Sequence, residues 1–278
     1  MEIPVLTGNL CARCGDLLGS PSADPTKPEA GASRTVLCRT CRMVPPPFAK
    51  AVAYGPYRDP LRSAIHALKY GRMHPAARRL GGLLAVAIGQ LAAEAPPEML
   101  VVPIPLHRSK YAQRGFNQAR SLAVHAVASL RRTHPQMKLI LASSTLMRLR
   151  PTASQAGLTS RERRLNVRGV FSVSDPGAVT LRHVLLIDDI LTTGATARAA
   201  AQELVKAGAA TVWVATLARA TRATAFGPGA QAVFEDLNDD TYMAGIAPSP
   251  TLGRFSPHPT GRASYEESIH SSHDQPSF

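Results

Sequence analysis

Hydrophobic runs alternate with amphipathic stretches along residues 49–220, and this alternation predicts the secondary structure. Over residues 61–70 the apolar side chains of Leu61, Ile65 and Leu68 recur at a helical spacing. Short apolar runs of strand length occur at 49–57, 99–105, 169–173, 183–187 and 211–217, and further helical stretches at 76–93, 117–132 and 196–207.

Residues with strong positional preferences fit the ends of these helices. Asn117 is a favourable N-cap, whereas Gly71 and Gly208 suit the carboxyl ends of two helices. Apolar strands that alternate with helices predict an α/β fold, with a parallel sheet covered by helices on both faces. In such sheets ligands bind beyond the carboxyl ends of the strands.

Four cysteines lie in two C-x-x-C pairs near the start of the chain, Cys11 with Cys14 and Cys38 with Cys41. Two such turns can complete a tetrahedral zinc site, and the absence of an open ligand position favours a structural role. Two redox dithiols or two short disulfides are the alternative, which a reducing compartment and the doubled spacing disfavour. Because the segment is too short to bury a sufficient core, we expect the metal to stabilise its fold.

Prolines and the loss of periodicity divide the chain into three segments. Consecutive prolines in "VPPPF" at 44–48 mark one boundary, and the sequence past about residue 220 is rich in Pro, Ser and Gly. We therefore predict a zinc-binding module at 8–44, an α/β domain at 48–220 and a poorly ordered tail at 221–278.

Charge is concentrated in one part of the chain. The net charge is +13, and residues 101–170 hold thirteen basic residues and one acidic residue, Glu162. A field of this size favours polyanionic partners, either a substrate that carries pyrophosphate or a nucleic acid. A solvated basic face without a partner is the alternative, and composition does not decide between them.

Membrane insertion and secretion are not expected. The chain has no run of about 18 uninterrupted apolar residues, and its first residues, "MEIPVLTGNLC", lack a basic lead and an apolar h-region. We expect a cytoplasmic protein without a membrane span.

The stretch "VLLIDDILTTGAT", residues 184–196, places two acids after a buried strand and a small-residue loop before a helix. Asp188 and Asp189 can accept hydrogen bonds from vicinal hydroxyls, or hold Mg²⁺ through water. The amides at the start of the helix form an anion cradle. Gly194 has no side chain, so an anion can approach the backbone closely there. This combination fits a ribose 5-phosphate.

Three other readings of this stretch are weaker. A Walker B strand requires a partner G-x-x-x-x-G-K-[ST] loop, and the chain contains no Gly-Lys pair. A receiver domain requires further acids at an early strand, and the early predicted strands show none. A plain strand–turn–helix with capping aspartates does not account for three threonines and a glycine after the paired acids.

The stretch at 184–196 resembles the loop of phosphoribosyltransferases that binds phosphoribosyl pyrophosphate (PRPP). Further motifs resemble the ComF family: "VVPIPLHRSKYAQRGFNQA" at 101–119, "LKYGR" at 68–72, and the leading four-cysteine module. The spaced residues Gln155, Arg161, Asn166 and Phe171 are also similar to that family. The resemblance covers residues 11 to about 219 and implies a type I phosphoribosyltransferase-like fold with a zinc-ribbon module.

The resemblance also implies roles for individual residues. Asp188 and Asp189 would hold the ribose hydroxyls, and the loop after Pro105 would meet the pyrophosphate. "RGFNQ", residues 114–118, would lie on a mobile lid over the anomeric carbon. The residues that would cradle the 5-phosphate are Thr192, Thr193, Gly194, Ala195 and Thr196; the candidate cations are Arg108, Lys110 and Arg114.

Catalysis by such a site needs orientation and neutralisation of the leaving pyrophosphate, with Mg²⁺ as the expected cofactor. Asp188, Asp189 and Arg114 are the residues expected to carry it, and no nucleophile or general base is assignable. His107 could relay a proton, although a single loop histidine is more often polar surface.

Two functions follow from the resemblance. The first is an enzyme, a PRPP-dependent phosphoribosyltransferase with an unidentified acceptor, in a family associated with DNA uptake and natural transformation. The second is a non-catalytic competence factor that binds single-stranded DNA or the uptake machinery and uses PRPP only as a regulatory ligand. Tyr111 and Phe116 are the only aromatic residues within 101–170, so phosphate contacts would dominate DNA binding.

Overall fold

The computed structural model describes residues 3–18, 36–70, 74–151, 167 and 169–220. Several predicted features lie outside the described residues. They are the helix end at Gly71, Arg72 of the "LKYGR" motif, the spaced residues Gln155, Arg161 and Asn166, most of the connector between the cysteine pairs, and the predicted tail at 221–278.

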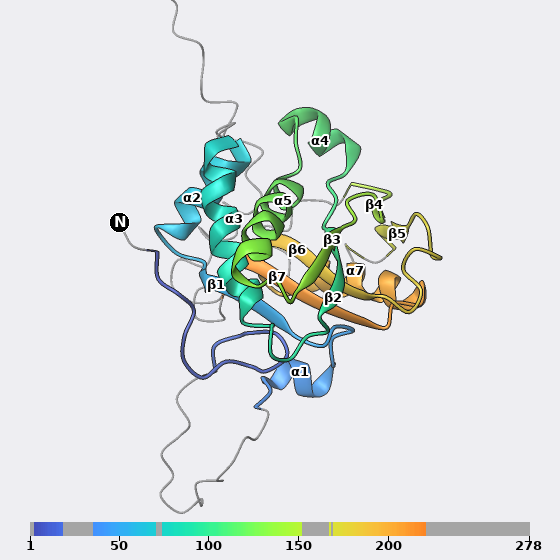
Figure 1. The fold of residues 1–278 in the computed structure, drawn as a ribbon, viewed down its shortest axis with the longest axis horizontal. Coiled ribbons are helices and arrows are strands. Elements are labelled where there is room, and N and C mark those ends of the chain that lie inside the picture. The colour runs from blue at the N-terminus through green and yellow to red at the C-terminus, as the bar shows by residue number, and fades with distance from the viewer. Residues whose placement is uncertain (1–2, 19–35, 71–73, 152–166, 168, 221–278) are drawn as a thin grey trace, which may run out of the picture. The chain divides into compact units, whose positions relative to one another are not determined.

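A five-stranded sheet, in the order β1-β7-β6-β2-β3, forms the centre of the described chain, and every pairing within it is parallel (Figure 1). The central strand β6 is hydrogen-bonded on both sides and is buried along most of its length, as its apolar sequence predicts. The strands are β1 (Ala51–Pro56), β2 (Glu98–Pro103), β3 (Lys138–Leu141), β6 (His183–Leu191) and β7 (Thr211–Arg219).

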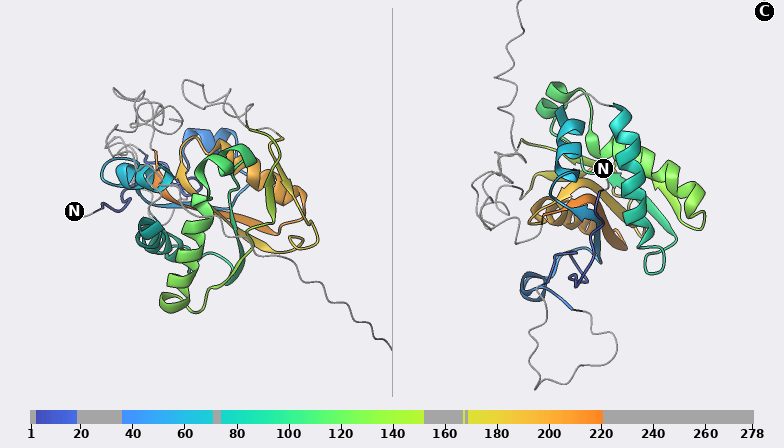
Figure 2. Two further views of the ribbon diagram at one scale, coloured as in Figure 1. Left: turned by 90° about the horizontal axis from the view of Figure 1, so that it is seen from above. Right: turned by 90° about the vertical axis from the view of Figure 1, so that its left-hand side faces the viewer.

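Helices cover both faces of this sheet, so the predicted fold class is confirmed (Figures 1 and 2). Strand alternation sends Leu185 and Ile187 of β6 into one apolar cluster, and Val184 and Leu186 into the other. The first cluster is covered by α2 (Leu61–Tyr70), α3 (His74–Gly89) and α5 (Gln118–Thr133), and the second by α7 (Ala195–Lys206). None of the described helices is both long and apolar enough to cross a bilayer.

The predicted strand at 169–173 does not join the parallel sheet. It forms β5 (Phe171–Val173), which pairs antiparallel with β4 (Leu146–Arg148) in a separate two-stranded sheet. Val170 and Phe171 still pack into the second apolar cluster. The apolar run therefore indicated burial correctly, but a strand of three residues is too short for its sequence to indicate its partner.

The segment after Pro105, predicted as a loop, contains the helix α4 (Arg108–Arg114). All seven of its residues are polar or small, and none is buried, so it lacks the apolar periodicity that would reveal it. Its ends are defined by caps instead. His107 accepts a hydrogen bond from the Ser109 amide at 3.3 Å, and Gly115 closes the helix at a φ of 77°.

Two neighbouring glycines of α3 provide a test of how α3 packs on α5. A Cβ at Gly81 would lie 2.4 Å from the His125 Cβ of α5, whereas a Cβ at Gly82 would meet nothing within 4 Å. We expect Gly81→Ala to lower the free energy of unfolding by about 1–3 kcal/mol through overpacking. We expect Gly82→Ala to raise it by about 0.5–1 kcal/mol through helix propensity. Urea denaturation of both variants checks this, and equal effects would contradict the packing.

Candidate functional site

The two acids of the central strand lie near its carboxyl end and have different neighbours. Strand β6 continues through both of them to Leu191, and Asp188 is paired with Thr216 of β7, so the acids are inside the strand rather than just after it. This corrects the predicted strand end at Ile187, because pairing with β7 outlasts the apolar run. Asp189 contacts side chains of α2 and α5, whereas Asp188 lies near the charge of Arg148 in β4.

Asp189 is held in a buried polar network. Its Oδ2 atom lies 3.0 Å from the Lys69 Nζ of α2 and accepts a hydrogen bond from the Gln118 Nε2 of α5 at 3.4 Å. Arg114 donates from Nη1 to the Gln118 Oε1 at 3.4 Å. The network therefore joins the "LKYGR" and "RGFNQ" motifs to the second acid, and it brings Arg114 to the predicted site.

Asp188 has a different electrostatic environment. Burial, together with the neighbouring Asp189 carboxylate, raises the pKa of Asp188 to about 7. The positive charges of Lys69 and Arg148 oppose this rise, as does the hydrogen bond that the Asp189 amide donates to the Asp188 Oδ1 at 2.9 Å. Near neutral pH, Asp188 therefore titrates within the range where a ligand can change its protonation.

The loop between β6 and α7 keeps the features of an anion cradle. Gly194 is the N-cap of α7, with a φ of 75° that favours glycine, and this residue has no side chain to cap the helix. The Ala195 amide makes a long hydrogen bond of 3.4 Å to the Thr193 hydroxyl. Thr192, Thr193 and Thr196 are each partly exposed. A 12-residue helix whose N-cap is a glycine offers amides of its first turn to an anion.

The "RGFNQ" motif forms the corner between α4 and α5, and its implied role as a lid over the anomeric carbon stays a prediction. Arg114 ends α4, Gly115 turns the chain, and Asn117 caps α5 by accepting from the Arg120 amide at 3.1 Å. Asn117 also donates to the Ile104 carbonyl at 3.0 Å, which fixes the corner to the end of β2.

The remaining predicted residues of this segment lie on α4. Arg108 is exposed and Lys110 is partly exposed, so both side chains can reach a ligand or solvent. His107 caps α4, and this structural role accounts for a polar loop histidine without a proton relay.

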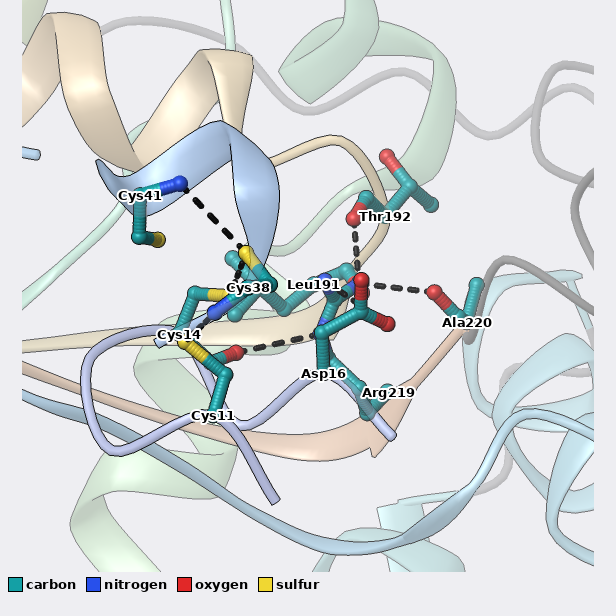
Figure 3. A network of polar contacts seen from close by, with 9 residues as sticks. All are labelled: Cys11, Cys14, Asp16, Cys38, Cys41, Leu191, Thr192, Arg219 and Ala220. Atoms are coloured by element: carbon teal, nitrogen blue, oxygen red, sulfur yellow. Dashed lines mark hydrogen bonds and ion pairs between the residues drawn. The ribbon is translucent and has the colours of Figure 1, made fainter. Parts of the chain in front are cut away.

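The four cysteines converge as the spacing predicts (Figure 3). Their sulfurs all lie within 4.8 Å of one another, and the Cys14 and Cys38 sulfurs are 3.8 Å apart. A tetrahedron of Zn–S bonds of about 2.3 Å has edges of about 3.8 Å, so the residues fit a zinc ion. All four cysteines are free thiols in the structure, rather than disulfides.

The surroundings of these thiols also favour a bound cation. Burial raises the pKa of the Cys14 thiol to about 11, and burial beside the other sulfurs raises the pKa of Cys41 further. Amides of Cys38 and Cys41 donate to the sulfurs of Cys11 and Cys38 at 3.2 and 3.4 Å. Four thiolates require a neutralising metal in this space, and the second pair is ordered by α1 (Arg39–Met43), which Cys38 caps.

Sequence reasoning missed four side chains of these sites. Lys69 and Gln118 stand inside the motifs quoted for the resemblance, so the motifs were the available indication. Arg148 of β4 and Arg219 at the end of β7 had no such indication, except that Arg219 is a charged residue directly after a buried apolar run.

Comparison with known proteins finds relatives over most of the chain. It is 32% identical over 213 residues to the DNA utilization protein YhgH of Salmonella typhi, which covers 76% of this chain and 84% of the relative. It is 33% identical over 184 residues to YhgH of Escherichia coli K12, covering 66% and 77%. It is 30% identical over 186 residues to the Competence protein F of Haemophilus influenzae, covering 66% and 78%.

Among solved structures, the chain is similar to a Bacillus subtilis glutamine PRPP amidotransferase complexed with ADP and GMP, at 20% identity and a TM-score of 0.34. That similarity covers 54% of this chain and 30% of the amidotransferase. No protein-family model matches. The identity to YhgH and to Competence protein F over most of their length shows that the chain belongs to the ComF family.

Proposed function

We propose that this protein binds PRPP at the carboxyl end of β6 and acts as a phosphoribosyltransferase-like protein in DNA utilization or uptake. One observation carries the proposal: paired acids on the central strand lead directly into a helix N-terminus whose N-cap is a glycine. Acceptors for a ribose diol and amides for a phosphate thereby lie within one short segment. The printed names of the relatives support a link to DNA utilization and competence.

Each part of the site has a distinct task in this proposal. Asp188 and Asp189 accept hydrogen bonds from the ribose hydroxyls, and the loop from Thr192 to Thr196 holds the 5-phosphate. The side chains of α4, Arg108, Lys110 and Arg114, neutralise the charge of the pyrophosphate as it leaves the anomeric carbon. The described residues of the site act by orientation and charge, and none of them is assigned as a nucleophile.

Mg²⁺ fits this site as a partner of the pyrophosphate, and bound there it would neutralise the leaving group. The Asp189 carboxylate already contacts Lys69 and Gln118. Asp188, the first acid of the pair, is therefore the better candidate to hold the ion through water.

Calorimetry with PRPP and Mg²⁺ tests the proposal. We expect the folded, metal-loaded protein to bind, and Asp188→Asn to bind at least about tenfold more weakly, since a charged hydrogen bond contributes about 1.5–3 kcal/mol. Asp175→Asn, in the turn after β5, is the matched control and should bind as the parent does, because Asp175 bonds only its own turn through the Ala178 amide in the described contacts. Absence of binding by the parent protein would reject the proposal.

The raised pKa of Asp188 predicts how PRPP binding depends on pH. Below pH 7 the carboxyl is mostly protonated, and binding to the ionised form must release that proton. Affinity should therefore rise from pH 6 to pH 8 in the parent protein. The part of this rise that comes from Asp188 should be absent in Asp188→Asn. Any pH dependence that remains in the variant comes from other groups, including those of PRPP itself.

The same shift has a consequence for the unliganded protein. A carboxyl whose pKa is raised on folding contributes stability below its ordinary value of 3.8, and loses it as pH rises through about 7. Urea denaturation between pH 5 and pH 8 should show this loss in the parent protein and not in Asp188→Asn.

Release of pyrophosphate distinguishes an enzyme that transfers phosphoribosyl groups from a protein that PRPP only regulates. A phosphoribosyltransferase releases pyrophosphate from PRPP in the presence of its acceptor, whereas a PRPP-regulated binding protein does not. A screen for pyrophosphate with nucleobases, amines and single-stranded DNA, with Asp188→Asn as the blank, distinguishes the two.

Binding of single-stranded DNA is the second candidate function, and exposed basic residues favour it. Arg120, Arg131, Arg132, Lys138 and Arg150 are all exposed. Tyr111 is also exposed, which gives one base a surface for stacking. We expect weak affinity that falls as salt rises, and an affinity insensitive to salt would contradict this electrostatic binding.

Free, clustered thiols are consistent with the reducing cytoplasm as the site of action.

A further inference from the structure

A single arginine lies between the four-cysteine module and the phosphate-binding loop (Figure 3). Arg219 ends β7 and is only 6% exposed. Its Nε donates to the Cys14 carbonyl at 3.1 Å, which belongs to the first cysteine pair. Its Nη1 donates to the carbonyls of Leu191, at 2.8 Å, and of Thr192. The same nitrogen also donates to the Ala220 carbonyl at 2.7 Å.

A second contact ties the same guanidinium to the module. The Arg219 Nη2 lies 3.4 Å from the Asp16 Oδ1, and Asp16 is 3% exposed. Asp16 is itself part of the first cysteine turn, because its carbonyl accepts from the Cys11 amide at 2.8 Å. The module therefore supplies both a carbonyl and a carboxylate to the buried guanidinium, and the carboxylate offsets part of the cost of burying its charge.

These contacts help to fix the orientation of the loop's peptide groups, together with the hydrogen bond that the Ala220 amide donates to the Leu191 carbonyl at 3.0 Å. A peptide unit is planar and trans, so its N–H points opposite to its carbonyl. Arg219 holds the carbonyls of Leu191 and Thr192, which directs the amides of Thr192 and Thr193 away from the guanidinium. A lysine has three donors on one nitrogen and no planar fork, so it cannot reproduce the five contacts that the guanidinium makes from three nitrogens.

We propose that Arg219 is a positioning residue that couples the metal site to the phosphate-binding loop. A bound metal holds the Cys14 turn and Asp16 in place, these hold the guanidinium, and the guanidinium holds the loop backbone at Leu191 and Thr192. The structural coupling stands by itself, and its effect on PRPP rests on the proposed function. Because coupling is reciprocal, a ligand on the loop also raises the affinity for the metal.

Hydrogen exchange of the full-length, metal-loaded chain tests the structural part. We expect Arg219→Lys to keep one zinc per chain, by elemental analysis, and to raise exchange at the amides of residues 192–197 about tenfold. Asp16→Asn, which leaves the carbonyl contacts of Arg219 intact, should give a smaller rise. Arg182→Gln is the matched control; it removes an exposed guanidinium paired with Glu98 at 2.9 Å and should leave the loop unchanged.

Removal of zinc from the parent chain should loosen the same amides and leave those of β2 and α5 protected. The same removal should change the loop little in Arg219→Lys, where the coupling is already lost. Unchanged loop exchange in Arg219→Lys, or equal loosening of all segments on metal removal, would overturn the proposal.

Calorimetry then separates this proposal from the proposed function. We expect PRPP with Mg²⁺ to bind the zinc-loaded parent about tenfold more tightly than Arg219→Lys or the zinc-free chain. If PRPP binds none of them while the exchange results hold, the proposed function fails and the coupling stands. If PRPP binds all of them equally, the coupling fails and the proposed function stands.

Discussion

Lys69→Met is expected to lower the free energy of unfolding by about 3–5 kcal/mol, because it leaves a buried carboxylate without its partner. Lys69 and Asp189 lie 3.0 Å apart, and each side chain is only 8% exposed. Methionine fills a similar volume, so the loss reports the missing charge rather than a cavity. Urea denaturation at pH 7 measures it.

A second ion pair of the same chain supplies the control. Lys50 and Glu94 lie 2.5 Å apart, but their side chains are 27% and 54% exposed. Lys50→Met should therefore cost no more than about 1 kcal/mol, as for a solvent-exposed pair. Lys69→Met combined with Asp189→Asn should recover most of the stability lost in the single variant. Equal costs at the two lysines, or no recovery in the double variant, would contradict the buried charge at Asp189.

The position of this pair explains why the fold tolerates its cost. A buried ion pair is often no more stabilising than well-packed apolar residues of the same volume. Here the carboxylate belongs to the acids proposed to hold ribose, and the lysine belongs to the "LKYGR" motif that resembles the ComF family. We therefore interpret Lys69 as a residue that holds the Asp189 carboxyl group in position for a ligand.

The elements with strong local patterns were predictable. Helix α2 was expected at 61–70 and begins and ends at those residues, because Leu61, Ile65 and Leu68 form one apolar face. Asn117 was expected to cap α5 and does so. The four cysteines were expected to converge, because two C-x-x-C turns share one geometry.

Most of the features that were not predictable from the sequence depend on contacts between distant segments. Nothing local distinguishes Lys69 from an exposed lysine, since its partner is 120 residues later in the chain. The same holds for Arg219, whose partner Asp16 lies at the opposite end of the described chain. Helix α4 is polar all round and was missed for lack of periodicity. The roles of Asp188, Asp189 and the threonines, and the segment boundaries at 8–44, 48–220 and 221–278, stay predictions.

Removal of one zinc ligand is expected to have the largest effect on the four-cysteine module. The buried members of its apolar cluster are three cysteines, with Cys14, Leu18 and Leu37 packed beside them, so little apolar area holds it together. Structural zinc sites contribute apparent binding free energies of about 10–16 kcal/mol, which here would replace a hydrophobic core. Cys41→Ala should therefore lose the metal and unfold the described parts of the module, residues 8–18 and 36–44.

Elemental analysis and hydrogen exchange check this result together. The zinc content should fall from one per chain to none, and the module's amides should lose protection while those of β6 and α5 keep it. Met43→Ala, an exposed position in the same helix α1, is the matched control and should retain the metal. If the purified parent chain instead carried no metal and its mass showed paired disulfides, the cysteines would be a redox site. A module that kept its protection in Cys41→Ala would show that packing against β1, through the bond from the Ala51 amide to the Arg13 carbonyl, is sufficient to hold it.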